Sequence, residues 1–100
     1  MQKSLHTEQQ DRLLSLLREL RQNNNVTQAD LAMRLDVTQS DISKVERGVR
    51  RLDVLELRAW LKALGTSLPE FALGLEAEIE AIAALNRRLQ KKATPSNTRS

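Results

Sequence analysis

The sequence lacks cysteine and has a single histidine, His6, near its N-terminus. Without cysteine the chain has no disulfide, no thiolate zinc site and no cysteine nucleophile, and one histidine does not make a metal site. The sequence also shows neither a glycine-rich phosphate loop nor an evident constellation of paired carboxylates. We therefore expect no enzyme activity, no metal and no cofactor.

Long apolar runs are also missing. No stretch is long enough to cross a membrane, and the N-terminus lacks the apolar region of a secretory signal. We expect a cytoplasmic protein with no membrane partner. Lys and Arg number 16 against 13 for Asp and Glu, and the net charge of +3 is compatible with a nucleic-acid partner but weak support by itself.

Aromatic residues are scarce, because Trp60 and Phe71 are the only two. A core must therefore be built from Leu, Ile, Val and Ala, which suits packed helices. β-branched residues are sparse and no alternation of apolar and polar residues persists, so the pattern predicts no strand. With 100 residues the chain has the length of one compact all-α domain.

Five capping boxes mark the expected helix starts, each a Ser, Thr or Asp followed three residues later by an acidic residue or Gln. They are Thr7 with Gln10, Thr27 with Asp30, Thr38 with Asp41, Asp53 with Glu56, and Ser67 with Glu70. Apolar residues at helical spacing follow each start. The pattern predicts helices at about residues 9–22, 28–35, 39–47 and 54–64, and a short fifth helical turn at about 69–73.

A sixth helix is expected from about residue 75 to 92, with a heptad seam whose spacing alternates between four and three. The seam consists of Leu75, Ile79, Ile82, Asn86 and Leu89. A narrow seam with one Asn favours dimerisation in a fixed register. The alternative is that this helix packs back on its own domain. A basic run near its end suits a helix C-terminus electrostatically or contacts DNA.

Residues 27–48 contain the pattern that is most informative about function. Two short helices are joined there by a tight turn around Asp36 and Val37, and because short helices are not stable alone, the pair must rest on the first and fourth helices. The outward residues of helix 39–47 can all form hydrogen bonds and none is acidic: Gln39, Ser40, Ser43, Lys44 and Arg47. Such side chains read base edges in the major groove. Arg47, Arg50 and Arg51 then follow as expected clamps on the phosphate backbone.

At these residues the sequence resembles the DNA-binding domain of the lambda repressor and Cro proteins, in the wider XRE family. The resemblance covers about residues 13–71. The family motif T-Q-x-x-L-A is present at residues 27–32, and the recognition helix ends in E-R-G at residues 46–48. Asp36 stands where the family usually has Gly in the turn, and Leu52 where it often has Pro. Asp tolerates the left-handed conformation better than most residues, so we expect the turn to form.

The resemblance implies roles for individual side chains. It places Gln39, Ser40 and Lys44 at the family's base-reading positions, with Ser43 on the same face for a base or a phosphate. It implies that Gln28 bonds a phosphate and steadies the Gln at the start of the recognition helix. It also implies a buried or partly buried ion pair between Arg21 and Glu46. The alternative for that pair is two unrelated surface charges.

The resemblance further implies an all-α, lambda-repressor-like bundle of five short helices with a helix-turn-helix, followed by the C-terminal helix. The expected organisation is a tail at 1–8, a helix-turn-helix domain at 9–73, a C-terminal helix at 74–92, and a disordered polar tail at 93–100. We expect a sequence-specific regulator of transcription that binds double-stranded DNA as a homodimeric repressor, with helix 39–47 in the major groove of a palindromic operator. The alternative is the antitoxin of a toxin–antitoxin pair, which would repress its own operon and bind a toxin protein.

Overall fold

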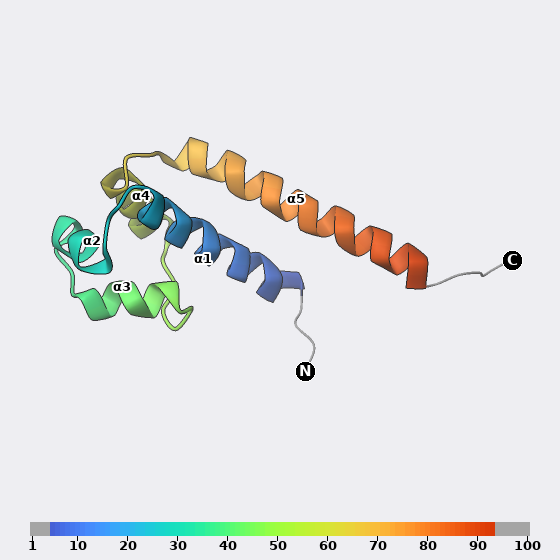
Figure 1. Ribbon diagram of the computed structural model, residues 1–100, viewed down its shortest axis with the longest axis horizontal. Helices are drawn as coiled ribbons and strands as arrows, with labels where there is room; N and C mark the ends of the chain where they lie inside the picture. Colours follow the sequence, from blue (N-terminus) through green and yellow to red (C-terminus); the bar gives the residue numbers. More distant parts are fainter. Residues whose placement is uncertain (1–4, 94–100) are drawn as a thin grey trace, which may run out of the picture.

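The computed structural model describes residues 5–93, with side chains for residues 7–90. This part of the chain contains five α-helices and no strand (Figure 1). The helices are α1 (Leu5–Asn23), α2 (Gln28–Leu35), α3 (Gln39–Glu46), α4 (Val54–Ala63) and α5 (Leu68–Ala93). The prediction of an all-α fold is confirmed, with one helix fewer than the pattern indicated.

The predicted fifth turn and sixth helix form one continuous helix, so the predicted break near Gly74 is wrong. The phase of the apolar positions explains the continuity, because Leu68, Phe71 and Leu75 share one face and all pack against the core. Gly74 has no positive φ that would end the helix. A glycine inside a helix costs about 1 kcal/mol relative to alanine. Burying one large apolar side chain contributes roughly 1.5–3 kcal/mol, so packing outweighs the local cost.

The first helix begins at Leu5, four residues before its predicted start. Thr7 therefore lies inside α1 rather than capping it, and the expected N-terminal tail is helical from Leu5 onward. The added turn lies beside α5, where the Asn86 Nδ2 atom donates to the Glu8 Oε1 atom at 3.3 Å. A tertiary contact thus extends the helix past a local start pattern. Residues 1–4 and 94–100, which include most of the predicted disordered tail, lie outside the described residues.

The core lies where α1 to α4 and the beginning of α5 meet. The four largest fully buried side chains come one from each of the first four helices: Leu17, Leu31, Ile42 and Leu61. Trp60 and Phe71, the two aromatic residues, are also buried in this cluster. Because each short helix contributes to the same core, their relative orientation is determined by packing rather than by helix propensity.

Local hydrogen bonds set the starts of the short helices. Complete capping boxes at the starts of α2, α3 and α4 confirm three of the five predicted boxes. The turn after α2 passes through Asp36 in the left-handed conformation, with φ 57° and ψ 47°. Gly48 ends the α3 segment at φ +79°, and a side chain there would be strained in that conformation and would lie 3.3 Å from the Leu14 Cδ1 atom.

The molecule has two parts, which we call the head and the arm. The head is residues 13–77 and contains the core. The arm consists of residues 5–12 of α1 and residues 78–93 of α5, which run antiparallel and extend away from the head (Figure 1). Within the arm, the Arg12 Nε atom pairs with the Glu78 Oε1 atom at 3.0 Å, next to the boundary with the head.

Candidate nucleic-acid interface

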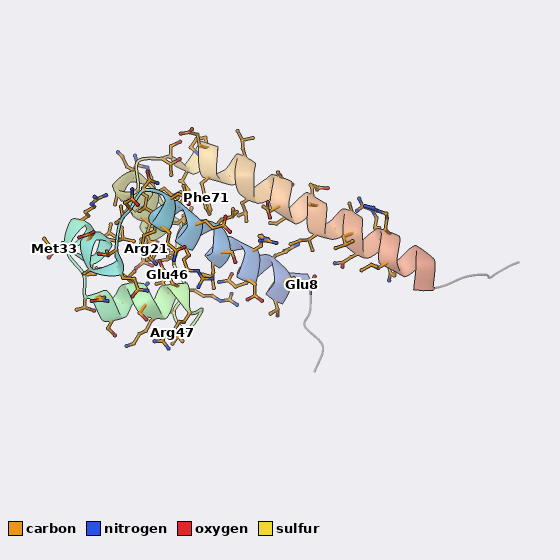
Figure 2. The ribbon with its side chains drawn as sticks, in the orientation of Figure 1. Glu8, Arg21, Met33, Glu46, Arg47 and Phe71 are labelled. Carbon is orange, nitrogen blue, oxygen red and sulfur yellow. The ribbon has the colours of Figure 1, made fainter. Side chains whose placement is uncertain are left out.

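Helix α3 is held in the head by its inner face and exposes its outer face. Ile42 and Val45 are 1% and 2% exposed and pack into the core. Gln39, Ser40 and Lys44 on the opposite side are exposed. Arg47, just beyond the helix end, extends away from the body of the molecule (Figure 2). The predicted base-reading residues are therefore gathered on one accessible surface.

Ser43 is the exception on that surface, because it is half-buried. Its Oγ atom accepts a hydrogen bond from the Arg47 Nε atom at 3.2 Å. The sequence pattern placed both side chains toward DNA but did not pair them. The bond orients the Arg47 guanidinium along α3.

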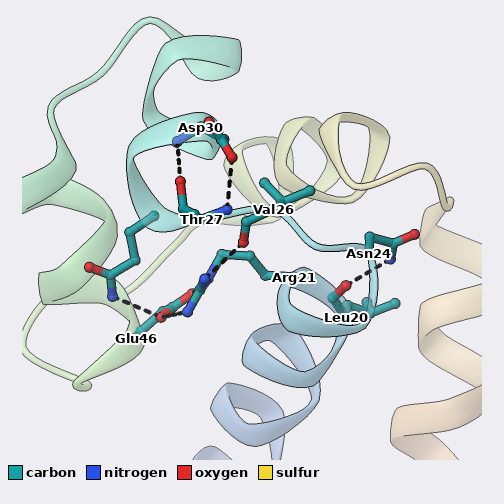
Figure 3. Close-up of polar contacts among 8 residues, drawn as sticks. Leu20, Arg21, Asn24, Val26, Thr27, Asp30 and Glu46 are labelled. Carbon is teal, nitrogen blue, oxygen red and sulfur yellow. Dashed lines mark hydrogen bonds and ion pairs between the residues drawn. The ribbon is translucent and has the colours of Figure 1, made fainter.

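A buried polar cluster ties α3 to α1. The Arg21 Nε and Nη2 atoms donate to the two Glu46 carboxylate oxygens at 2.6 and 3.0 Å. The two side chains are 9% and 3% exposed. The Arg21 Nη1 atom also donates to the Val26 carbonyl at 2.9 Å (Figure 3). The structure brings together the two residues that the resemblance paired, in a two-bond geometry that suits a guanidinium and a carboxylate.

Gln28 joins this cluster. Its Nε2 atom donates to the Glu46 Oε1 atom at 3.0 Å, which holds the amide at the start of α2. Gln28 and Gln39 line the same open hollow of about 550 Å³, together with residues from the end of α1. The expected phosphate contact and the first base-reading residue thus lie next to each other at the starts of the two helices.

The two acidic residues near the recognition surface, Asp30 and Asp41, accept hydrogen bonds from backbone N–H groups at helix starts. The Thr38 backbone N–H donates to the Asp41 Oδ2 atom at 3.2 Å, and the Asp41 backbone N–H donates to the Thr38 Oγ1 atom at 3.1 Å. The Thr27–Asp30 box has the same reciprocal geometry (Figure 3). Backbone hydrogen bonds from the two threonines are the main cause that lowers the pKa of Asp30 and of Asp41 below the usual 3.8.

The loop after α3 carries the three expected phosphate clamps. The Lys44 carbonyl accepts from the backbone N–H groups of Val49 and Arg50 at 2.8 and 3.2 Å, so the loop folds back on the end of α3. Arg51 is exposed. The Arg50 guanidinium, however, pairs with the Glu56 carboxylate on α4. This hydrogen bond is the main cause that raises the pKa of Arg50 and lowers the pKa of Glu56.

Sequence reasoning missed the partner of Arg50. Glu56 was identified only as the third residue of a capping box, and its Oε1 atom does accept from the Asp53 backbone N–H at 3.0 Å. The Glu56 Oε2 atom takes no part in the capping box, and it is the oxygen that pairs with Arg50. A basic residue six positions before a capping Glu, across a short loop, is the signal that could have indicated the pair.

The predicted dimerisation seam lies partly against α1 of the same chain. Leu75 packs on the core, and Asn86 is bonded to Glu8. Ile79 and Ile82 are half-buried, whereas Leu89 is 54% exposed. The seam is thus increasingly uncovered toward the C-terminal end of α5.

Neither a metal centre nor a membrane span is found in the described part of the chain. Residues 5–93 contain no group of three or more His, Cys, Asp or Glu side chains placed to hold a metal ion. Over the same residues, every helix is too short or too polar to cross a bilayer.

Comparisons with known proteins match the head. A family model described as helix-turn-helix matches residues 17–71. The structure is similar to an XRE-family like protein from Pseudomonas syringae pv. tomato str. DC3000, with 40% identity and a TM-score of 0.69 over 73% of this chain and 89% of that one. It is also similar to the restriction-modification controller protein C.Esp1396I, solved as a tetramer with its natural 35-base-pair operator, with 28% identity and a TM-score of 0.65 over 71% and 93% of the chains.

The clp gene regulator ClgR from Corynebacterium glutamicum shares the fold at 24% identity, with a TM-score of 0.68 over 88% of this chain and 96% of that one. A search of curated proteins gave no match. The family match covers more than half of the chain and includes α2 and α3 completely. Its members are regulators that bind double-stranded DNA rather than enzymes. The chain belongs to the XRE (Cro/C1-type) helix-turn-helix family of DNA-binding transcription regulators.

Proposed function

We propose that the protein is a sequence-specific repressor that binds a roughly palindromic operator as a homodimer, with α3 in the major groove of each half-site. The observation that carries this proposal is the outer face of α3. It presents Gln39, Ser40 and Lys44 while its inner face is buried in the core. Side chains that read base edges must be held in a constant register, and the start of a recognition helix is where such contacts are made.

The contacts around α3 support a division between positioning and reading. Phosphate contacts position a protein on the duplex, while base contacts specify the sequence. Gln28, Arg47 and Arg51 surround α3 and serve as phosphate contacts in this proposal. Arg50 serves this role only if a phosphate competes with or joins its pair with Glu56. In this proposal the protein acts in the cytoplasm, together with the operator that it binds.

The test of sequence-specific binding is selection of bound sites from random duplex DNA by the parent and by Gln39→Ala. Gln90→Ala is a control of the same residue type, in the arm and away from α3. We expect the parent and the control to enrich the same short palindrome, with half-sites about 34–36 Å apart. Gln39→Ala should lose preference at one position of each half-site, at a cost of about 1–3 kcal/mol. Binding without an enriched sequence would contradict the proposal.

The clamp role is tested by the salt dependence of binding to the selected site. Arg51→Ala should weaken binding on all sequences and reduce the slope of log affinity against log salt by about one. Gln39→Ala should leave that slope unchanged, because a neutral base contact releases no counterion. Repression itself is tested with a reporter downstream of the selected operator, where the proposal requires lower expression in the presence of the protein.

A further inference from the structure

Arg50 differs from the other two arginines expected to clamp phosphates, because it is paired with a carboxylate. Its Nη2 atom contacts the Glu56 Oε2 atom across the loop between α3 and α4. Within the part of the chain that the structure describes, neither Arg47 nor Arg51 pairs with an acidic side chain. The free protein therefore offers two of these arginines without an ionic partner and holds the third on its own surface.

The Glu56 carboxylate is fixed in place by the start of α4. Its Oε1 atom accepts from the Asp53 backbone N–H at 3.0 Å, and the Glu56 backbone N–H donates to the Asp53 Oδ1 atom at 2.7 Å. Because the capping box holds one oxygen of Glu56, the other has a constant position next to Arg50. Asp41 lines the same hollow of about 200 Å³ as this pair and adds negative charge near the guanidinium.

The backbone of Arg50 is placed for a contact with DNA. Its N–H donates to the Lys44 carbonyl at 3.2 Å, so the residue lies at the end of α3, the helix proposed for the major groove (Figure 1). The side chains of Arg50 and Glu56 are 44% and 38% exposed, so a phosphate can approach the pair from solvent. A guanidinium forms the same forked hydrogen bonds with a carboxylate and with a phosphate. Glu56 and a DNA phosphate therefore compete for one donor group.

We propose that Glu56 is an internal competitor of the DNA backbone, which holds Arg50 in the free protein and gives it up to a phosphate when α3 docks. The inference rests on the proposed function, because it requires α3 in the groove and the loop after α3 beside a phosphate. Since phosphate contacts carry no sequence information, the competition lowers the affinity for every duplex and leaves the choice of operator unchanged. Glu56 thus adjusts the strength of binding, whereas Gln39 contributes to its sequence preference.

The test compares Glu56→Gln with the parent in binding to the selected operator and to an unrelated duplex. Gln also completes a capping box, so the variant retains the start of α4 while it loses the charge that holds Arg50. Binding to both duplexes should strengthen about two- to fivefold, because an exposed ion pair no longer has to be broken. The slope of log affinity against log salt should become steeper by up to about one, since no freed Glu56 carboxylate recruits a cation. The selected sequence should not change.

Glu70→Gln is the matched control. Glu70 is exposed at the start of α5, three residues after Ser67, as Glu56 stands three residues after Asp53, and it has no arginine partner among the described residues. The control changes the net charge by the same amount, so it measures the general gain from removing one negative charge. We expect it to bind DNA close to the parent. Circular dichroism and thermal unfolding verify that both variants are folded.

A double-mutant cycle separates competition from simple repulsion between Glu56 and DNA. Arg50→Ala should weaken binding more in the Glu56→Gln background than in the parent, by a further factor of about two to five. Equal effects of Glu56→Gln with and without Arg50 would indicate repulsion alone and would overturn the inference. It is also overturned if Glu56→Gln binds no better than Glu70→Gln, or if Arg50→Ala has no effect in the Glu56→Gln background. These outcomes leave the proposed function intact, whereas failure of the parent to bind any duplex would contradict the proposed function and this inference together.

Discussion

The head and the arm contain parts of the same two helices, α1 and α5, but they are stabilised in different ways. In the head, the Arg21–Glu46 pair is almost fully buried and makes further bonds. In contrast, Arg12 and Glu78 form a single contact between side chains that are 42% and 41% exposed. The comparison shows that the segment of α1 in the core is tied to α3 by buried bonds, whereas the segment of α1 in the arm is tied to α5 by solvent-exposed ones. Exposed ion pairs contribute little to stability, so we expect the arm to be the less stable part.

Truncating an apolar side chain should change the free energy of unfolding far more in the head than in the arm, and this is the largest of the three expected differences. Leu61 in the head is 0% exposed, whereas Leu89 in the arm is 54% exposed. Leu61→Ala should lower the free energy of unfolding by about 3 kcal/mol, because it removes transfer energy and leaves a cavity. Leu89→Ala should change it by less than about 0.5 kcal/mol at concentrations where the chain is monomeric. Chemical denaturation measures both, and equal losses would show that the arm is packed as tightly as the head.

Breaking the ion pair of the head should cost more stability than breaking that of the arm, with a difference almost as large as that between the two leucines. Glu46→Gln leaves the buried Arg21 guanidinium without its counter-charge and should cost about 3 kcal/mol of stability. Glu78→Gln breaks the exposed pair and should cost at most about 1 kcal/mol. Replacing both members of the buried pair, as in Arg21→Met with Glu46→Leu, should recover part of the loss. A cost of Glu46→Gln no greater than that of Glu78→Gln would remove this distinction between head and arm.

Acid should affect the head through its capping carboxylates, and this is the smallest of the three effects. The pKa values of Asp30 and Asp41 are lowered in the folded protein, so their contribution to stability is present above the usual 3.8. It is lost as the pH falls through the lower folded value. Asp41→Asn should therefore flatten the fall in stability below about pH 4 relative to the parent. Denaturation curves measured between neutral pH and about pH 3 compare them, and identical acid profiles for parent and Asp41→Asn would contradict the capping role.

Much of the head could be predicted because its patterns are local. The starts of α2, α3 and α4 follow capping boxes whose two residues are three positions apart, and Asp36 takes the left-handed turn where the family usually has Gly. The failures share a different cause. Thr7 begins a box but lies inside α1, and Gly74 falls where a break was expected but lies inside α5. In both places a contact with another helix outweighs the local preference.

The candidate site was predicted in its composition and in the Arg21–Glu46 pair, which the family resemblance implied, but not in its other internal bonds. The outer face of α3 follows from helical periodicity, so the accessible positions of Gln39, Ser40 and Lys44 could be expected. The bond from Arg47 to Ser43 and the pair between Arg50 and Glu56 could not, because each donor has several possible partners within reach. The path of the loop after α3 determines which of these partners each arginine contacts.

The sequence by itself determined the helical class, the starts of the short helices and the set of polar side chains offered to DNA. Each of these depends on residues three or four positions apart, so the chain encodes them before it folds. The tertiary structure decided the geometry of the Arg21–Glu46 pair, which the family resemblance implied across 25 residues. It alone decided that α1 covers one end of the α5 seam while leaving Leu89 at the other end exposed. Those outcomes depend on how helices distant in sequence meet in the core, and no spacing along the chain specifies that meeting.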